Sequence, residues 1–346
     1  MPNPLRWGIL GTGNIARKFA EALAKSETGS LVAVGSRKQE TADKFADEFG
    51  APRRHGSYEA FVAEGAVDAV YNSLPNHLHL EWTTKCAEAG KHVLCEKPLT
   101  VNHAEAMRMV DAAKASDVFL MEAFMYRCHP QTAKLVELIR DGAVGEVRVI
   151  QAHFGYSLAG SANPYGNIRL QNAVGGGAIM DVGCYTVSAC RLVAGAALGQ
   201  SCSAEPEGVS GAAHIGEIGR VDEWATAVLK FPNGILANVT CGALCAVGTV
   251  LRVWGSQGSL EVPNPWFPGR AAEVETILLN RDGKETEAVS VPSQQGLLYT
   301  LEADAVASHL AERQAPWPCM TWEDSLGNMK ALDRWRESSG LAFDCE

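Results

Sequence analysis

Residues 7–16 read WGILGTGNIA, a short apolar run that enters a G-x-G-x-x-A turn at the start of a helix. This pattern is typical of dinucleotide binding, because Gly11 permits the sharp turn and Gly13 lets the backbone approach a pyrophosphate. Ala16 allows the helix to pack closely on the strand while the helix N-terminus faces the anion. A glycine turn without a ligand is the simpler alternative, which the flanking strand and helix disfavour. The residues expected at the pyrophosphate are Gly11, Gly13, Asn14 and Ile15.

The first third of the chain alternates apolar, β-branched strands with amphipathic helices, which predicts βαβ units and a doubly wound parallel sheet. One helical face, for example, carries Ile15, Phe19 and Leu23 at intervals of four residues. The expected strands are residues 5–10, 31–34, 67–74, 92–95 and 118–121. The expected helices are residues 15–24, a segment around 42–49, and residues 79–89 and 102–115.

The pattern changes beyond residue 130, where strands follow one another through hairpin turns and predict an antiparallel sheet. The turn signals are Pro232-Asn233-Gly234, Ser256-Gln257-Gly258 and Arg281-Asp282-Gly283. Strands are expected at 147–154, 223–231, 235–240, 251–254 and 259–262, and helices at 178–193, 298–312 and 322–336. A chain of 346 residues favours two domains. We predict a dinucleotide-binding domain at 1–125 and a substrate-binding and oligomerisation domain at 126–346.

The composition excludes several classes of protein. A formal net charge of −10 and the absence of long basic runs argue against nucleic acid as a partner. We find no signal-peptide pattern and no run of about 18 apolar residues, so we expect a cytoplasmic protein that does not bind membranes. The ten cysteines are scattered without a C-x-x-C motif, which predicts reduced, mostly buried thiols and no metal site.

The second expected strand ends in Gly35-Ser36-Arg37-Lys38. At this position a carboxylate normally accepts a hydrogen bond from the ribose 2′-hydroxyl of NAD. Here two cations and a hydroxyl replace it, which suits the 2′-phosphate of NADP. Ser36, Arg37 and Lys38 are therefore predicted to bind NADP in preference to NAD, although ordinary solvated surface cations would give the same sequence.

Glu96-Lys97-Pro98 follows a predicted parallel strand, at the edge where open α/β sheets bind ligands. The Lys97 ammonium is suited to bind a substrate hydroxyl and to stabilise a developing alkoxide. A solvated lysine at the end of a strand is the alternative.

The glycine turn at 175–177 leads into a predicted helix that presents Asp181 and Tyr185 on one face. A tyrosine is a general acid or base when its pKa, ordinarily about 10, is lowered. An ammonium about 4 Å away would supply roughly 4 kcal/mol, or about three pKa units before screening. The alternative is a tyrosine packed between helix and sheet with a satisfied hydroxyl.

Taken together, these motifs resemble those of the Gfo/Idh/MocA oxidoreductases. The resemblance covers nearly the whole chain. It is carried by residues 11–16, 74–79 (LPNHLH), 89–98 (AGKHVLCEKP), 121–127 (MEAFMYR) and 175–185. Inositol dehydrogenase-like members have His at the position of Tyr185. A tyrosine there, together with the MEAFMYR stretch, resembles the branch that contains dimeric dihydrodiol dehydrogenase, glucose-fructose oxidoreductase and xylose dehydrogenases.

The resemblance implies an α/β fold, with an N-terminal Rossmann domain and a C-terminal α/β domain built on a large open, mainly antiparallel sheet. The outer face of that sheet commonly forms the interface of a homodimer or homotetramer. Lys97 and Tyr185 would be catalytic, with Asp181 beside them. Further cofactor contacts would come from Leu74, Asn76, His79, Glu96 and Lys97, and substrate contacts from Arg127, Arg169 and Asp181.

The expected function is NADP-dependent hydride transfer between nicotinamide C4 and a hydroxyl or carbonyl carbon of a sugar or related cyclic polyol. An aldose, an anhydrosugar and a trans-dihydrodiol all remain open as substrates. A non-catalytic NADP-sensing regulatory protein is one alternative, which intact Lys97 and Tyr185 disfavour. The other alternative is an enzyme that keeps one NADP tightly bound and recycles it by oxidising one sugar and reducing another.

Overall fold

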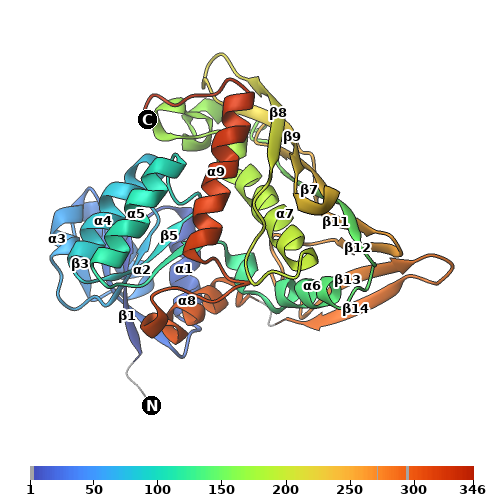
Figure 1. The fold of residues 1–346 in the computed structure, drawn as a ribbon. Helices are drawn as coiled ribbons and strands as arrows, with labels where there is room; N and C mark the ends of the chain where they lie inside the picture. The colour runs from blue at the N-terminus through green and yellow to red at the C-terminus, as the bar shows by residue number, and fades with distance from the viewer. Residues whose placement is uncertain (1–3, 271, 294–295) are drawn as a thin grey trace. The chain divides into compact units, whose positions relative to one another are not determined.

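The computed structural model describes residues 4–270, 272–293 and 296–346 (Figure 1). The chain forms two compact units, each built from more than one segment. Unit 1 comprises Met1–Thr100, Ala104–Cys128 and Gly296–Trp322, and unit 2 comprises Val101–His103, His129–Gln295 and Glu323–Glu346. The boundary predicted at residue 125 lies close to the end of the second segment of unit 1. Residues 296–322, however, return to unit 1 from the part of the sequence assigned to the second domain.

Unit 1 is built on a six-stranded parallel sheet with the order β3-β2-β1-β4-β5-β6. Its strands are β1 (Leu5–Leu10), β2 (Gly29–Gly35), β3 (Arg53–His55), β4 (Ala69–Asn72), β5 (His92–Glu96) and β6 (Leu120–Ala123). The predicted doubly wound fold is confirmed, and only β3, whose Arg-Arg-His sequence lacks apolar residues, was missed. The strand order reverses between β1 and β4, so their carboxyl ends border the usual ligand crevice of this fold.

The helices of unit 1 cover the parallel sheet. They are α1 (Asn14–Leu23), α2 (Gln39–Phe49), α3 (Tyr58–Val62), α4 (His79–Glu88), α5 (His103–Ala115) and α8 (Leu298–Ser308), with 3₁₀ turns η1 (Asn76–Leu78), η2 (Met125–Cys128) and η8 (Leu310–Glu312). Helix α8 packs on α1. The Thr300 hydroxyl donates to Ala22 O at 3.0 Å and the Ser26 hydroxyl donates to Asp304 at 2.8 Å. These contacts explain why α8 belongs to unit 1.

Unit 2 is built on an eight-stranded sheet with the order β14-β13-β12-β11-β7-β10-β9-β8. Its strands are β7 (Val147–Gly155), β8 (Gly208–Ile215), β9 (Asp222–Lys230), β10 (Leu236–Gly242), β11 (Thr249–Gly255), β12 (Gly258–Val262), β13 (Val274–Arg281) and β14 (Glu287–Pro292). Every neighbouring pair is antiparallel except β7 and β10. The mainly antiparallel sheet and its three predicted hairpins are confirmed. Strand β8 was missed, because its glycine, alanine and serine residues give little apolar alternation. Strands β13 and β14 were indicated only by the turn signal between them.

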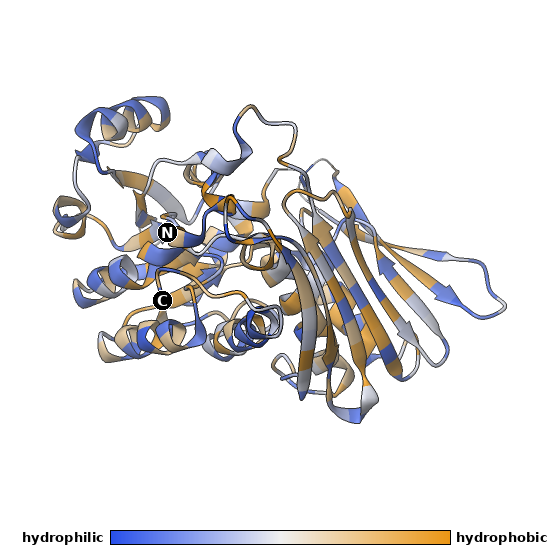
Figure 2. Cartoon of the chain, turned by 90° about the horizontal axis from the view of Figure 1, so that it is seen from above, coloured by the Kyte–Doolittle hydropathy of each residue, from blue (hydrophilic) through white to orange (hydrophobic). Residues whose placement is uncertain are grey.

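Helices cover one face of the eight-stranded sheet. They are α6 (Pro130–Arg140), α7 (Cys184–Ala197) and α9 (Trp322–Ser338), and α7 packs on β7 and β10. Figure 2 shows hydrophobic and hydrophilic residues alternating along these strands. On β9 alternate residues from Ala225 to Leu229 are buried, and those between them, from Trp224 to Lys230, are exposed. One face of the sheet therefore forms the core of unit 2.

The predicted helix at 178–193 begins differently from expectation. Ile179–Gly183 is a π-helical turn, which leads directly into α7. By length and hydropathy the stretch Asn172–Ala197 would suit a membrane, but 94% of its most apolar window is buried in the protein. A helix that is apolar on all sides and buried in this way is typical of a protein core.

Candidate active site

The glycine turn after β1 has the geometry of a phosphate-binding loop. Gly11 has a φ angle of +102°, and a Cβ atom there would lie 2.7 Å from Ser73 Oγ at the end of β4. A Cβ atom at Gly13 would meet nothing within 4 Å, and no side chain of the described residues caps the N-terminus of α1. Ala16 is fully buried. The first amides of α1, from Asn14 and Ile15, are thus suited to hold a pyrophosphate.

The end of β2 carries two exposed cations. The Ser36 hydroxyl is nearly buried and lies 2.8 Å from the Thr41 hydroxyl, whereas Arg37 and Lys38 are exposed. Among the residues that the structure describes, neither cation forms an ion pair. Other cations of this region are paired: Arg17 with Glu48, Lys44 with Glu40 and Arg54 with Asp47. Arg37 and Lys38 therefore keep their charges available for an anion such as a phosphate ester.

Residues 97–101, which follow β5 and are called the Lys97 loop here, begin at the carboxylate of Glu96, the last residue of that strand. This carboxylate accepts hydrogen bonds from the Tyr71 hydroxyl and, at 3.2 Å, from the backbone N–H of Lys97. Burial and the charge of Glu96 raise the pKa of Tyr71 well above its ordinary value, so the phenol remains protonated and donates. The Lys97 backbone is held by a side chain from its own strand.

Two further buried side chains hold the same loop. The His79 ring lies 3.0 Å from Pro98 O through Nδ1 and 2.7 Å from Leu74 O through Nε2. Glu122 on β6 accepts a hydrogen bond from the backbone N–H of Leu99 at 2.8 Å. His79 is fully buried and burial lowers its pKa, so the ring is neutral and donates to only one of these two carbonyl oxygens. The ring nevertheless lies between the ends of β4 and β5 and acts as a brace there. A direct cofactor contact by His79 stays a prediction.

Sequence reasoning missed Glu302 of α8, a second acid in this region of unit 1. It is fully buried, and its carboxyl oxygens have no hydrogen-bond partner among the described residues. Burial, followed by the charge of Glu96, raises its pKa well above the ordinary value. Its position within a helical pattern gave no signal, because the influence of the Glu96 charge depends on segments about two hundred residues apart in the sequence.

Arg127, predicted to bind substrate, is buried in unit 1 with 1% of its surface exposed. Its Nε donates to Pro318 O, and its Nη2 lies 3.5 Å from Cys319 O. The guanidinium thus ties η2 to the 318–319 segment of the same unit. Its contact with substrate stays a prediction, as do those of Leu74, which is buried, and Asn76, which lies in η1.

Asp181, in the π-helical turn of unit 2, is the centre of a polar group. Its Oδ2 accepts a hydrogen bond from the Tyr156 hydroxyl and forms an ion pair with Arg169 Nε at 3.1 Å. Burial and the Asp181 charge raise the pKa of Tyr156 far above its ordinary range, so Tyr156 serves as a hydrogen-bond donor. Two of the three unit 2 site residues predicted from sequence, Arg169 and Asp181, are therefore in direct contact.

Tyr185, at the start of α7, lies in an aromatic cluster. Its ring packs edge-on against Phe154 at 5.3 Å and against Trp266 at 6.0 Å, measured between ring centroids. Phe154 and Trp266 stack on each other at 5.6 Å. Only 4% of Tyr185 is exposed, so these rings fix the orientation of its phenol.

The glycine turn before Asp181 leaves no space for side chains. A Cβ atom at Gly176 would lie 2.7 Å from Ile168 O, and one at Gly177, whose φ is +108°, would lie 2.1 Å from Asp222 Oδ1. Asp222 is fully buried and accepts a hydrogen bond from the backbone N–H of Ile179 at 2.6 Å. Burial raises the pKa of Asp222 to about 8. Sequence reasoning missed this acid, which anchors the turn and the π-helical start from β9.

The predicted residues thus fall into two groups. Unit 1 holds Gly11, Gly13, Asn14, Ile15, Ser36, Arg37, Lys38, Leu74, Asn76, His79, Glu96, Lys97 and Arg127, and unit 2 holds Arg169, Asp181 and Tyr185. The unit 1 group lies at or after the carboxyl ends of parallel strands. The unit 2 group lies on the glycine turn, the π-helical turn and α7.

Comparisons with known proteins match both parts of the chain. Residues 5–124 match the family model described as "Oxidoreductase family, NAD-binding Rossmann fold" (GFO_IDH_MocA), and residues 132–261 match the GFO/IDH/MocA C-terminal domain. A D-xylose 1-dehydrogenase (NADP(+)) from Haloferax volcanii is 34% identical, over 97% of each chain. A trans-1,2-dihydrobenzene-1,2-diol dehydrogenase from Mus musculus is 34% identical, over 98% of each chain.

Among solved structures, a 3-ketoreductase from Actinomadura kijaniata in complex with NADP and TDP-benzene has a TM-score of 0.85. It is 31% identical, and the match covers 97% of this chain and 98% of that one. An aldose-aldose oxidoreductase from Caulobacter crescentus complexed with glycerol has a TM-score of 0.84 at 26% identity, over 98% of each chain. The similarity extends across both units.

Proposed function

Because the chain belongs to the GFO/IDH/MocA oxidoreductase family, we propose that it is an NADP-dependent dehydrogenase or reductase of a sugar or related cyclic polyol. The names of similar proteins state D-xylose, trans-1,2-dihydrobenzene-1,2-diol and, for a 32% identical reductase from Actinomadura kijaniata, dTDP-3,4-didehydro-2,6-dideoxy-α-D-glucose. These substrates share a ring or chain carbon bearing a hydroxyl or carbonyl group. The observation that carries the proposal is the Lys97 loop, which four side-chain and backbone contacts fix after β5.

The preference for NADP rests on Arg37 and Lys38. A charge-assisted hydrogen bond contributes about 1.5–3 kcal/mol, which corresponds to roughly 10- to 150-fold in affinity. Replacing Arg37 with Asp should raise the NADPH dissociation constant by at least that factor and the NADH constant little, as measured by nucleotide fluorescence. Lys44→Asp is the matched control, because it reverses an exposed charge of α2 that is paired with Glu40. Equal losses for NADPH and NADH would contradict the assignment.

The chemistry assigned to the chain is proton handling and charge stabilisation. When bound, NADP supplies the hydride donor or acceptor at nicotinamide C4. Oxidation of the substrate also requires that its hydroxyl proton leave, and we assign the Tyr185 phenolate as the group that accepts this proton and becomes the phenol. In the direction of reduction the Tyr185 phenol donates the proton instead. The Lys97 ammonium stabilises the alkoxide that develops on the substrate oxygen. Arg169 and Asp181, already paired with each other, orient the neighbouring substrate hydroxyl groups.

The direct test follows NADPH absorbance with a panel of aldoses, ketosugars and trans-dihydrodiols. Tyr185→Phe should bind NADPH normally and lose most of its turnover, because general acid-base catalysis contributes about 10²–10⁴-fold. An undiminished rate in this variant would remove Tyr185 from the role. Absence of turnover by the native protein with NADPH and NADH would favour a regulatory protein. Nucleotide that survives dialysis would favour an enzyme that retains its cofactor.

The open face of the unit 2 sheet is proposed to bind a second copy of the chain. Leu236 and Trp254 are each paired in register with Val149 of the central strand β7. Their exposed fractions are 44%, 37% and 40%, which makes a continuous apolar row across three strands. Leu236→Lys should convert an oligomer into a smaller species in light scattering. Met107→Lys, at an exposed apolar position on α5 of unit 1, is the control, and an unchanged mass in both variants would contradict the proposal.

A further inference from the structure

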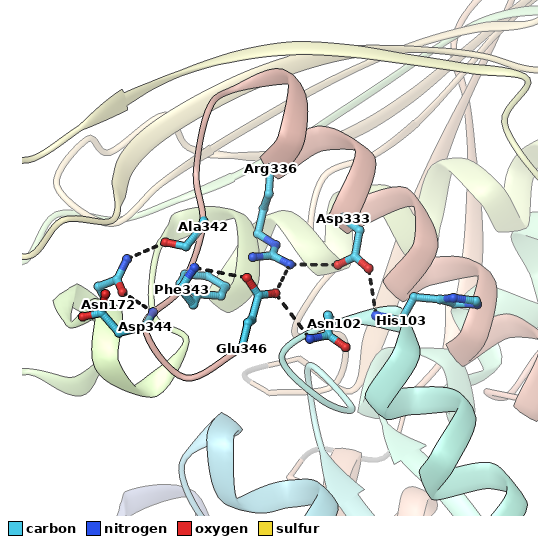
Figure 3. Close-up of polar contacts among 9 residues, drawn as sticks. All are labelled: Asn102, His103, Asn172, Asp333, Arg336, Ala342, Phe343, Asp344 and Glu346. Carbon is cyan, nitrogen blue, oxygen red and sulfur yellow. Dashed lines mark hydrogen bonds and ion pairs between the residues drawn. The ribbon is translucent and has the colours of Figure 1, made fainter.

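Residues 341–346 turn back after α9 and bind two other parts of unit 2 (Figure 3). At one end of this 341–346 segment, the Glu346 carboxylate accepts hydrogen bonds from Arg336 at 2.6 Å, from the backbone N–H of Phe343 at 3.1 Å and from the Asn102 amide at 3.4 Å. The Arg336 guanidinium lies over the Phe343 ring at 4.4 Å, and its side chain is 5% exposed. The Glu346 carboxylate therefore joins α9, through Arg336, to the 341–346 segment and to the Asn102 side chain.

The same segment binds Asn172, whose side chain is nearly buried. The Asn172 amide nitrogen donates to Ala342 O and to Arg220 O, both at 2.8 Å, and its oxygen accepts from the backbone N–H of Asp344 at 2.7 Å. The hydrogen-bonding groups of this amide are thus used to join three separate parts of the chain. An amide with several buried backbone partners has one orientation that satisfies them.

Asn172 begins the turn that leads into the candidate site. Its carbonyl oxygen accepts a hydrogen bond from Gly175 N at 3.0 Å, and Gly177 N donates to Arg169 O at 2.7 Å. The turn therefore connects Arg169 to the π-helical segment that carries Asp181. Gly176 and Gly177 lie against backbone and Asp222 atoms and leave this turn little room to adjust. We therefore expect a shift at Asn172 to reach both residues of the Arg169–Asp181 pair.

A second chain of contacts reaches the segment that follows the Lys97 loop. Arg336 also pairs with Asp333 at 2.9 Å, and Asp333 accepts a hydrogen bond from the backbone N–H of His103 at 2.8 Å. Asn102, which donates to Glu346, is only five residues beyond Lys97 in the sequence. The cluster in Figure 3 thus holds the Asn102 side chain and the His103 backbone through Arg336, Asp333 and Glu346. It holds the Asn172 side chain through the backbone of residues 342 and 344.

We propose that the 341–346 segment is a latch that positions the substrate-binding pair Arg169 and Asp181, with Glu346, Arg336 and Asn172 as its positioning residues. The assignment of Arg169 and Asp181 to substrate rests on the proposed function. The latch acts through backbone placement and contributes no group to the reaction. Displacement of reacting groups by about 1 Å can cost about 10²-fold in rate, so a partial release should be measurable.

The test is Glu346→Gln, which keeps the side-chain shape but removes the charge that pairs with Arg336. We expect kcat/KM for the substrate to fall roughly tenfold, mainly through KM, and the NADPH dissociation constant to remain within twofold. Hydrogen exchange of the amides in residues 169–177 should accelerate. Glu346→Ala should have the larger effect on both measurements. Glu337→Ala is the matched control, because Glu337 is an exposed glutamate on α9, next to Arg336 in the sequence.

Two results would overturn the proposal. Native kinetics in Glu346→Gln would show that the latch does not position the site, even if the melting temperature falls. Altered kinetics with native exchange across 169–177 would place the effect elsewhere. If Glu346→Ala does not fold, Glu346→Gln alone decides. If the native protein turns over no tested substrate, the proposed function fails, and the exchange measurement still tests the latch.

Discussion

Replacing Asp222 with asparagine should change how the stability of unit 2 depends on pH. Burial raises the pKa of this carboxyl from 3.8 to about 8, whereas in the unfolded chain it returns to the ordinary value. Below pH 4 the group is protonated in both states and imposes no cost. Between pH 4 and 8 only the unfolded state releases the proton, so the free energy of unfolding falls as the pH rises.

The magnitude follows from the size of the shift. One pKa unit corresponds to about 1.4 kcal/mol, so the full effect is at most about 6 kcal/mol between pH 4 and pH 8. Asparagine resembles the protonated acid and can still accept the hydrogen bond from Ile179 N–H. Asp222→Asn should therefore be more stable than the native protein near pH 8, and this advantage should disappear towards pH 4.

Urea unfolding followed by tryptophan fluorescence at pH 5, 6, 7 and 8 measures this difference. The native protein should lose up to about 1.4 kcal/mol per pH unit relative to Asp222→Asn. Asp282→Asn makes the same chemical change at an exposed turn and should leave the native pH dependence unaltered. A difference between Asp222→Asn and the native protein that stays constant from pH 5 to 8 would refute the reasoning.

Three further substitutions test the supports of the candidate site. Gly177→Ala should lower the melting temperature by several degrees, because the new Cβ atom would meet Asp222 and the residue has a positive φ angle. Gly160→Ala, where the Cβ atom has open space, should leave the melting temperature unchanged. Equal melting temperatures in the two variants would contradict this reasoning. His79→Ala should reduce kcat by loosening the Lys97 loop, and unchanged steady-state kinetics would show that the brace is dispensable. Tyr156→Phe removes a hydrogen bond to Asp181 and should reduce kcat/KM about tenfold; in a cycle with Arg169→Ala, additive losses would argue against a shared role.

The sequence predicted the features that depend on short-range patterns. The turn at residues 11–16 was recognisable because its glycines, strand and helix are contiguous, and β1 lies at the residues expected. The hairpins of unit 2 were recognisable for the same reason, since their turn residues stand between alternating strands. By contrast, β3 and β8 have little apolar alternation, so they form strands only because a neighbouring strand supplies their hydrogen bonds.

The sequence predicted the residues of the candidate site that lie in motifs, but not the buried residues around them. Lys97, Asp181 and Tyr185 lie in recognisable motifs, while Glu302, Asp222 and Asn172 occur in stretches with no distinctive pattern. Asp222 and Asn172 form hydrogen bonds with residues that are distant in the sequence, and Glu302 is affected by burial and by the charge of the distant Glu96. No local pattern encodes such interactions. The return of residues 296–322 to unit 1 escaped prediction for the same reason.

The sequence by itself determined the parallel sheet, its glycine turn and the family, because periodicity and contiguous motifs are local properties of the chain. Only the tertiary structure decided that Arg37 and Lys38 lack acidic partners among the described residues while nearby cations are paired. It also decided which buried acids hold the Lys97 loop and the Gly177 turn. Burial and charge pairing depend on what packing brings together across the whole chain, and they decide which of the predicted residues are held in place.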